Sequence, residues 1–210
     1  MGTEMRVCRI FAGGDTGLQC VKVNEDDLVI CADRGYASAK KLGVAPHIIV
    51  GDFDSYEGEL PEDSEILRSV PEKDDTDTLL AIKTALERGV GEIVIYGAMG
   101  GRFDHTVANI QSLSYIHGRG CTGTIVDDDN IITVCGKGVH RFPFMEGYYF
   151  SVFAMTDELY IKVMTGVKYP LADYVMTGSF PIGVSNEITD ADAVLDITDG
   201  LALVVRSKMK

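Results

Sequence analysis

Long apolar runs and an excess of basic residues are both missing from this 210-residue sequence. No stretch approaches the ~20 consecutive apolar residues that a membrane-spanning helix needs, and no basic flank with an apolar core marks a signal peptide. The 19 Lys and Arg residues stand against 32 Asp and Glu residues, for a formal net charge of -13, so a nucleic-acid backbone would be repelled. We therefore expect a cytoplasmic protein that binds neither nucleic acid nor a membrane.

Cysteine is scarce and shows no pairing pattern. The five cysteines are an odd number, without CxxC spacing or a nearby histidine at zinc-ligand spacing. Cys8 and Cys31 lie inside apolar runs, which favours small buried hydrophobic residues over reactive nucleophiles. We predict reduced thiols.

Apolar residues make up 46% of the sequence, enough for one large core or two modest ones. In residues 1–130, short apolar runs alternate with helical patterns that each end near a glycine. The predicted strands are Val7–Ala12, Leu28–Ala32, Ile48–Val50, Ile93–Tyr96 and Gly123–Val126. The predicted helices are Tyr36–Leu42, Thr78–Arg88 and Thr106–His117. This alternation predicts a mainly parallel α/β sheet.

The pattern changes in residues 131–210, where short β-rich segments are separated by Gly, Asp and Pro turns. The predicted strands here are Ile131–Val134, Tyr148–Ala154, Leu159–Val163, Ala193–Ile197 and Leu201–Val205. We therefore expect a second, all-β domain. No Pro- or Ser-rich linker separates it from the first domain.

Two carboxylates follow the third predicted strand. Asp52 and Asp54 are two residues apart, so in an extended chain they share one face. Carboxylates at the carboxyl end of a parallel strand lie where open α/β sheets bind ligands, and Mg²⁺ takes one or two carboxylates plus phosphate oxygens and water. The pattern fits a metal site, but it also fits a polar turn capped by Asp side chains.

The segment 73–77, Lys-Asp-Asp-Thr-Asp, opens the second predicted helix. Acidic residues at this end favour the positive pole of the helix dipole and often only cap it. Four charged residues in five exceed what one cap requires, and Asp74 and Asp77 would share a face of a helical turn. A second metal or phosphate shell is the alternative.

A glycine-rich segment, Gly97–His105, joins a predicted strand to the third helix. Its glycines allow close backbone approach, and the helix N-terminus after it can receive an anion. The segment matches neither the Walker A pattern nor GxGxxG. Arg102 adds a guanidinium suited to a two-pronged phosphate contact, and Asp104 adds a carboxylate. For His105 we favour a structural role over acid–base chemistry.

Asp15 and Asp33 repeat the pattern of strand end, glycine and aspartate near the N-terminus. Each alone is an ordinary turn. With the two later clusters, however, they place an aspartate after four strands or strand-like runs on one rim of one sheet. This convergence favours a shared polyanion site at which metal ions offset the carboxylate repulsion.

These motifs resemble the thiamine pyrophosphokinase family, in order and along nearly the whole chain. The matching segments are GGD at Gly13–Asp15, CADRGYASAKKLG at Cys31–Gly43, VGDFDS at Val50–Ser55, PEKDDTDTLLAI at Pro71–Ile82, GGRFDHTVANI at Gly100–Ile110, GVKYPL at Gly166–Leu171 and GVSNEI at Gly183–Ile188. The resemblance implies an α/β ATP-binding catalytic domain followed by a thiamine-binding β-sandwich. It also implies a homodimer with active sites at the subunit interface.

The resemblance assigns roles to the residues within these motifs. The implied Mg²⁺–ATP carboxylates are Asp52, Asp54, Asp74 and Asp77, the implied phosphate and catalytic pair is Arg102 and Asp104, and the implied thiamine-pocket residues are Ser185 and Asn186. In this chemistry the thiamine hydroxyl attacks the β-phosphorus of ATP, the co-substrate, and AMP leaves. Mg²⁺ and Arg102 neutralise the developing charge. Asp104 and Asp54 are both candidates to accept the hydroxyl proton.

Two features depart from the family pattern. Arg34 stands where many members carry glycine, so either the backbone differs there or the arginine adds a phosphate contact. The sequence also has no tryptophan, so a thiamine-stacking tryptophan known in some relatives is absent and another side chain has to cover the ring.

Two other classes of function compete with the kinase. A metal-dependent phosphohydrolase or a sugar-nucleotide glycosyltransferase would use Asp52 and Asp54 but gives no role to the later motifs. A non-catalytic thiamine or nucleotide sensor would keep the pocket, but the intact Asp and Arg set argues against lost chemistry.

Overall fold

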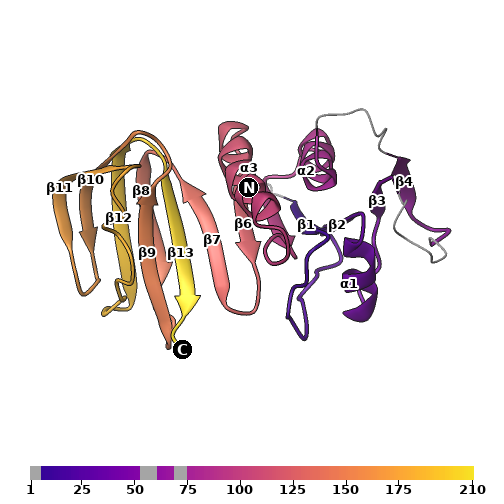
Figure 1. The fold of residues 1–210 in the computed structure, drawn as a ribbon, viewed down its shortest axis with the longest axis horizontal. Helices are drawn as coiled ribbons and strands as arrows, with labels where there is room; N and C mark the ends of the chain where they lie inside the picture. The colour runs from indigo at the N-terminus through magenta and orange to yellow at the C-terminus, as the bar shows by residue number, and fades with distance from the viewer. Residues whose placement is uncertain (1–5, 53–60, 69–74) are drawn as a thin grey trace. The chain divides into compact units, whose positions relative to one another are not determined.

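The computed structural model describes residues 6–52, 61–68 and 75–210. The chain divides into two compact units, which span residues 1–128 and 129–210 (Figure 1). The N-terminal unit contains every helix described below, and the C-terminal unit is built from strands.

The N-terminal unit is a parallel sheet with helices. Its elements are β1 (Val7–Phe11), β2 (Leu28–Ala32), α1 (Gly35–Lys41), β3 (Ile48–Gly51), β4 (Glu65–Arg68), α2 (Asp77–Glu87), β5 (Glu92–Tyr96), α3 (Phe103–Gly118) and β6 (Thr122–Val126). Within this unit the strand order is β4-β3-β2-β1-β5-β6, and each neighbouring pair is parallel. The predicted mainly parallel α/β architecture is confirmed.

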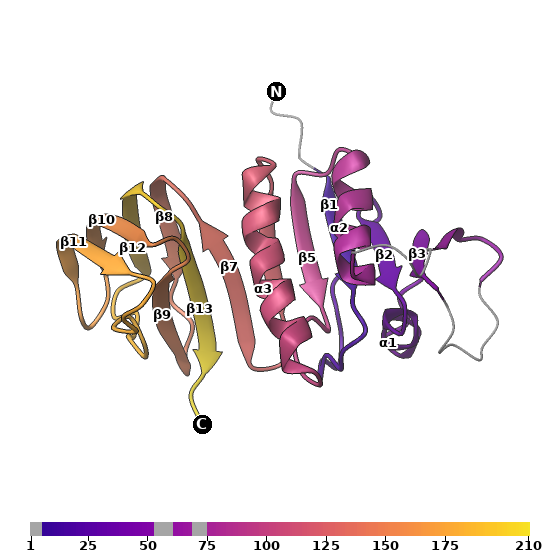
Figure 2. The ribbon, with the colours of Figure 1, turned by 45° about the horizontal axis from the view of Figure 1, so that its top comes forward.

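Both faces of this sheet are covered, which explains why its strands are apolar at successive positions. On one face, Tyr36 and Ala39 of α1 join a buried cluster with Phe11 and Val29. Side chains alternate along a strand, so Ile30, between Val29 and Cys31, points to the other face. The helices α2 and α3 contact each other and lie side by side against the strands (Figure 2).

The C-terminal unit consists of antiparallel strands. They are β7 (Asn130–Cys135), β8 (Gly138–Pro143), β9 (Tyr148–Ala154), β10 (Glu158–Thr165), β11 (Leu171–Thr177), β12 (Asp192–Asp199) and β13 (Ala202–Lys208). Strand β13 pairs with β7 and β9, and a second sheet has the order β11-β10-β12-β8. One core cluster joins the two sheets, with Phe150 and Val204 from the first and Leu159 and Leu195 from the second. The predicted all-β domain is confirmed.

The thiols agree with the prediction that they are reduced. All five cysteines are free, and burial raises the pKa values of the Cys8 and Cys31 thiols to about 12, which makes both poor nucleophiles. Within the described ranges, no helix is both long and apolar enough to cross a membrane.

Candidate active site

A cavity of about 430 Å³ lies in the N-terminal unit, where the turns after β1, β2 and β5 meet the start of α2 and of α3. Parallel strands bring their carboxyl ends to one edge of the sheet, which is where open α/β sheets bind ligands. The lining residues include Gly13, Gly14, Asp15, Asp33, Arg34, Thr76, Asp77, Thr78, Gly97, Gly100, Gly101, Arg102, His105 and Asn109. Residues from four of the predicted motifs therefore line one cavity, among them Asp15, Asp33, Asp77 and Arg102.

The turns after β1 and β5 pack backbone against backbone. The N–H of Gly14 donates to the carbonyl of Gly97 over 2.9 Å. A Cβ on Gly14 would lie 2.5 Å from that oxygen and 2.7 Å from the carbonyl oxygen of Met99, closer than any side chain tolerates. Gly97 has φ +65, the left-handed conformation that glycine adopts without strain. Glycine at both positions lets the two loops form one wall of the cavity.

The turn after β2 is held between its two neighbouring strands. A Cβ on Gly35 would lie 1.9 Å from the carbonyl oxygen of Phe11, so α1 begins directly against the end of β1. Asp33 has φ 46, a conformation that aspartate tolerates better than most residues. Its N–H donates to the carbonyl of Val50 over 2.7 Å. These contacts place Asp33 in the cavity wall beside the end of β3.

Helix α2 brings its N-terminus to the cavity. Thr76 is the N-cap, and its hydroxyl accepts a hydrogen bond from the N–H of Leu79 over 3.2 Å. Asp77 is the first helical residue and lines the cavity. Its position at the positive end of the helix dipole suits both a carboxylate and a bound phosphate.

Arg102 and Asp104 form a two-pronged ion pair at the start of α3. Arg102 is the N-cap residue; its Nε and Nη2 donate to the two carboxylate oxygens of Asp104 over 3.1 and 2.5 Å. Both side chains are exposed. The hydrogen bond from Arg102 lowers the pKa of the Asp104 carboxyl. The two predicted functional residues are thus paired with each other, and Arg102 still lines the cavity.

Asn109 also lines the cavity, although the sequence reading assigned it no role. It is buried on α3, and its side-chain amide donates to the carbonyl of Ala98 over 2.7 Å. This bond ties the glycine-rich loop to the helix that follows it. The available signal was a polar residue at helical spacing before the buried Leu113 and Ile116.

The predicted carboxylates fall into three groups. Asp15, Asp33 and Asp77 line the cavity. Asp52 follows β3, next to Gly51, and a Cβ on Gly51 would lie 3.2 Å from the Cα of Asp33. Asp54 and Asp74 lie outside the described residues. Among the residues that the structure describes, no three His, Cys, Asp or Glu side chains form a ready-made metal site.

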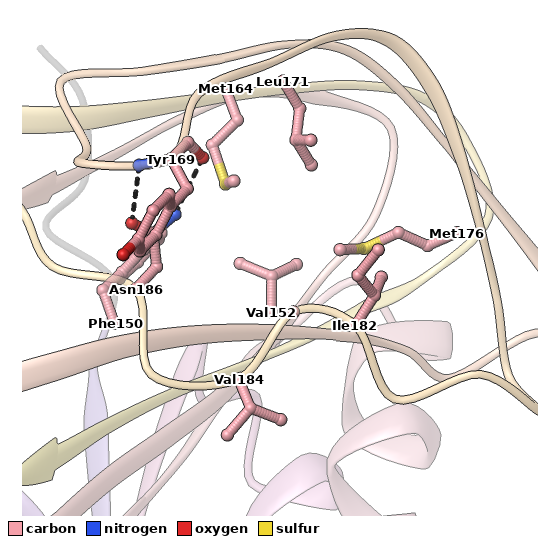
Figure 3. A pocket seen from close by; sticks show the side chains of 10 residues that line it. Phe150, Val152, Met164, Tyr169, Leu171, Met176, Ile182, Val184 and Asn186 are labelled. Atoms are coloured by element: carbon pink, nitrogen blue, oxygen red, sulfur yellow. Dashed lines mark hydrogen bonds between the residues drawn. The ribbon is translucent and has the colours of Figure 1, made fainter.

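The predicted thiamine-pocket residues lie in the C-terminal unit, which holds a mostly apolar cavity of about 260 Å³ (Figure 3). Ser185 is not among the residues that line it. Asn186 lines this cavity and is buried. Its Oδ1 accepts from the N–H of Tyr169, and its Nδ2 donates to the carbonyl of Tyr169, both over 3.0 Å. Ser185 has φ 58, and its N–H donates to the hydroxyl of Ser151 over 3.0 Å.

Comparisons with known proteins cover both units. Residues 21–124 match the family description "Thiamin pyrophosphokinase, catalytic domain", and residues 139–201 match "Thiamin pyrophosphokinase, vitamin B1 binding domain". The thiamine pyrophosphokinase of Bacillus subtilis is 29% identical over 214 residues, covering 97% of this chain and 99% of the relative.

Solved structures agree with the sequence matches. The crystal structure of thiamine pyrophosphokinase from Bacillus subtilis has a TM-score of 0.86 at 27% identity and covers 97% of this chain and 99% of its own. That of a thiamin pyrophosphokinase family protein from Enterococcus faecalis has a TM-score of 0.84 at 28% identity, with coverages of 98% and 100%. Both matched domains, in the expected order, show that the chain belongs to the thiamin pyrophosphokinase family.

Proposed function

We propose that this chain is a thiamine diphosphokinase, which transfers the pyrophosphoryl group of ATP to the hydroxyl of thiamine and releases AMP. One observation carries the proposal: glycine loops, two helix N-termini, three aspartates and two arginines meet at one cavity in a chain of this family. The helix N-termini and glycine backbone suit phosphate oxygens, and the carboxylates suit the cation that accompanies a triphosphate.

Mg²⁺ fits the donor set of this cavity. Asp15, Asp33 and Asp77 offer hard oxygen ligands, and Mg²⁺ commonly takes only one or two carboxylates, with phosphate oxygens and water completing its shell. We assign Asp52, Asp54 and Asp77 to metal binding, and Asp15, Asp33 and Asp74 to the surrounding Mg²⁺–ATP shell. When bound, the metal would neutralise charge on the phosphate oxygens.

Arg102 binds phosphate in the proposed reaction, and Asp104 accepts a proton. The planar fork of Arg102 suits two phosphate oxygens as well as it suits the Asp104 carboxylate. When phosphate takes the fork, Asp104 loses the hydrogen bond that lowers its pKa and becomes a stronger proton acceptor. Asp104 then accepts the proton of the attacking hydroxyl, with Asp54 as the second candidate. Binding of ATP thereby increases the basicity of Asp104.

We assign thiamine recognition to the C-terminal unit. The side-chain amide of Asn186 is engaged by the backbone of Tyr169, so Asn186 acts as a positioning residue for that tyrosine. The ring of Tyr169 is 61% exposed at the cavity edge, and it offers the aromatic surface that a tryptophan would otherwise supply. Ser185, held in a left-handed turn next to Asn186, completes the proposed pocket.

We further propose a homodimer with active sites at the subunit interface. Phe180, Ile182 and Val184 are at least half exposed along one segment of the C-terminal unit. In the N-terminal unit, Phe103 is 79% exposed between the two residues of the catalytic ion pair. Apolar side chains gathered next to functional residues favour contact with a second protein surface.

The decisive experiment incubates purified protein with ATP, Mg²⁺ and thiamine and follows AMP and thiamine diphosphate by chromatography. Both products should appear in the complete mixture and in neither the thiamine-free nor the metal-free control. Phosphate release without thiamine would instead support the phosphohydrolase. Binding of both ligands without AMP would support the sensor.

A further inference from the structure

A second arginine lines the ATP cavity, outside the ion pair already described. Arg34 is the residue before α1 and is exposed on the cavity wall. Its side chain leaves the backbone beside the glycine loop after β1, because a Cβ on Gly13 would lie 3.9 Å from the Cβ of Arg34. The side chain of Arg34 is therefore attached next to the glycine turns that form one wall of the cavity.

The backbone at Arg34 shows that an arginine is accommodated without distortion. Its φ is -60 and its ψ is -14, an ordinary right-handed conformation. The left-handed residue of this turn is Asp33, with φ 46. Position 34 therefore does not require the conformational freedom of glycine. The sequence left two explanations for an arginine at this position, a different backbone or an added phosphate contact. The ordinary backbone at Arg34 favours the phosphate contact.

The side chain of Arg34 has no partner among the residues that the structure describes. Within the described part of the chain its guanidinium makes no ion pair or side-chain hydrogen bond, although Asp15 and Asp33 line the same cavity. It forms no cap on α1. The fork of Arg102, by contrast, is occupied by Asp104. Arg34 therefore offers a planar fork that need not break an internal ion pair to bind an anion.

We propose that Arg34 binds the polyphosphate chain of the nucleotide through a two-pronged contact to its non-bridging oxygens. The inference rests on the proposed function, since it takes ATP as the ligand of this cavity. Three aspartates line the cavity and repel a polyphosphate, so a direct contact from Arg34 adds to the compensation that Arg102 and the metal would supply. A lysine would supply the charge but not the fork.

Calorimetry in Mg²⁺ without thiamine tests the contact under conditions without turnover. The ligands are ATP and inorganic tripolyphosphate, which share the phosphate chain but not the nucleoside. We expect Arg34→Gln to lower the affinity for both ligands by about tenfold. Arg34→Lys should lower both affinities by about threefold. The control is Arg119→Gln, at the opposite end of α3, where the guanidinium lies 4.7 Å from the centre of the Tyr115 ring. It should bind both ligands like the wild type.

Each other result has a definite meaning. Wild-type affinity in Arg34→Gln, with its melting temperature unchanged, would overturn the contact. Wild-type affinity in Arg34→Lys would show that charge alone matters and would overturn the two-pronged geometry. A lower affinity for ATP but not for tripolyphosphate would show that Arg34 contacts the nucleoside, and would overturn the phosphate contact. If the wild type makes no AMP but Arg34→Gln still loses tripolyphosphate, the proposed function fails while the anion contact stands.

Discussion

At the scale of single residues, Arg102 has the largest influence on the pKa of Asp104. The hydrogen bond from Arg102 is the largest cause of its lowered pKa, ahead of its other contacts. The carboxyl therefore stays ionised to a lower pH than an isolated aspartate does, and it is a weak base while the pair is intact. This is why the proposed mechanism needs phosphate to displace Asp104 from the fork.

We predict that Arg102→Gln raises the pKa of Asp104 toward that of an unperturbed aspartate. The raised pKa means that protonation begins at a higher pH in the variant. Carbon-detected NMR titration of the aspartate carboxyls measures the shift, with Arg119→Gln as the matched control. Identical Asp104 titrations in wild type and Arg102→Gln would show that the ion pair does not persist in solution.

A second ion pair joins the partly buried Arg9 to the buried Asp27 and has a structural role. Arg9 Nε lies 2.7 Å from Asp27 Oδ2, and the exposed fractions of the side chains are 15% and 4%. Burial alone would raise the pKa of Asp27, but the N–H of Asn24 and the Arg9 guanidinium outweigh it and lower that pKa. Arg9 also donates to the hydroxyl of Tyr96 over 3.0 Å, which links the loop before β2 to β1 and β5.

We predict that Asp27→Asn lowers the free energy of unfolding at neutral pH by about 2 kcal/mol, because it leaves the partly buried Arg9 guanidinium without its counter-charge. The contribution of a carboxyl with lowered pKa is present above its unfolded pKa and is lost as the pH falls through its folded pKa. The variant should lack that acid-side loss. Urea unfolding at several pH values measures both effects.

The control for this prediction is Glu65→Gln, which breaks an exposed pair. Arg88 Nη2 lies 2.8 Å from Glu65, and both side chains are more than 40% exposed. Such pairs contribute at most about 1 kcal/mol. Equal losses in Asp27→Asn and Glu65→Gln would contradict the structural role of the pair with Arg9.

At the scale of elements, the shape of the cavity depends on two glycine turns in backbone contact. We predict that Gly14→Ala costs about 2 kcal/mol of stability, since its methyl group would overlap two carbonyl oxygens. Gly13→Ala is the matched control: its Cβ would have a nearest neighbour at 3.9 Å, and stability should stay within about 1 kcal/mol of the wild type. Thermal unfolding of both variants compares them. Equal melting temperatures would refute the docking of the two turns.

The elements that sequence reasoning missed share one property. Strands β4, β8 and β11 each lie at the end of the strand order within their own unit. An edge strand is partly solvated, so its sequence lacks the continuous apolar run that marked β2. β4 reads Glu-Ile-Leu-Arg with exposed ends, and β11 has only one buried residue among its seven. The central parallel strands were predictable because burial on both faces dictates their residues. The helices were predictable because one apolar face recurs at helical spacing.

The candidate site was predictable in part for a related reason. Asp15 and Asp33 follow from the rule that parallel strands end at one edge, Asp77 follows from the charged segment that opens α2, and all three line the cavity. The pairing of Arg102 with Asp104 depends on side-chain rotamers that no spacing rule specifies. The contact of Asn186 with Tyr169 joins segments 17 residues apart, and a sequence pattern does not encode such a contact.

At the scale of the whole molecule, the chain combines two units, each with its own core, and each carries one matched domain of the family. We predict a dimer in size-exclusion chromatography with light scattering. Replacing Phe180 and Ile182 together by serine should shift the protein toward monomer and reduce turnover, with Val139→Ser, which removes an exposed side chain on β8, as the control. A fully active wild-type monomer would contradict the shared site.

The central claim is that the intact pyrophosphoryl group moves in one step, with attack at the β-phosphorus. ATP labelled with ³²P at the β-phosphorus tests it directly when it is incubated with Mg²⁺, thiamine and the purified protein. The account predicts label in thiamine diphosphate, unlabelled AMP and no thiamine monophosphate at early times. Labelled ADP formed together with unlabelled thiamine monophosphate would contradict it.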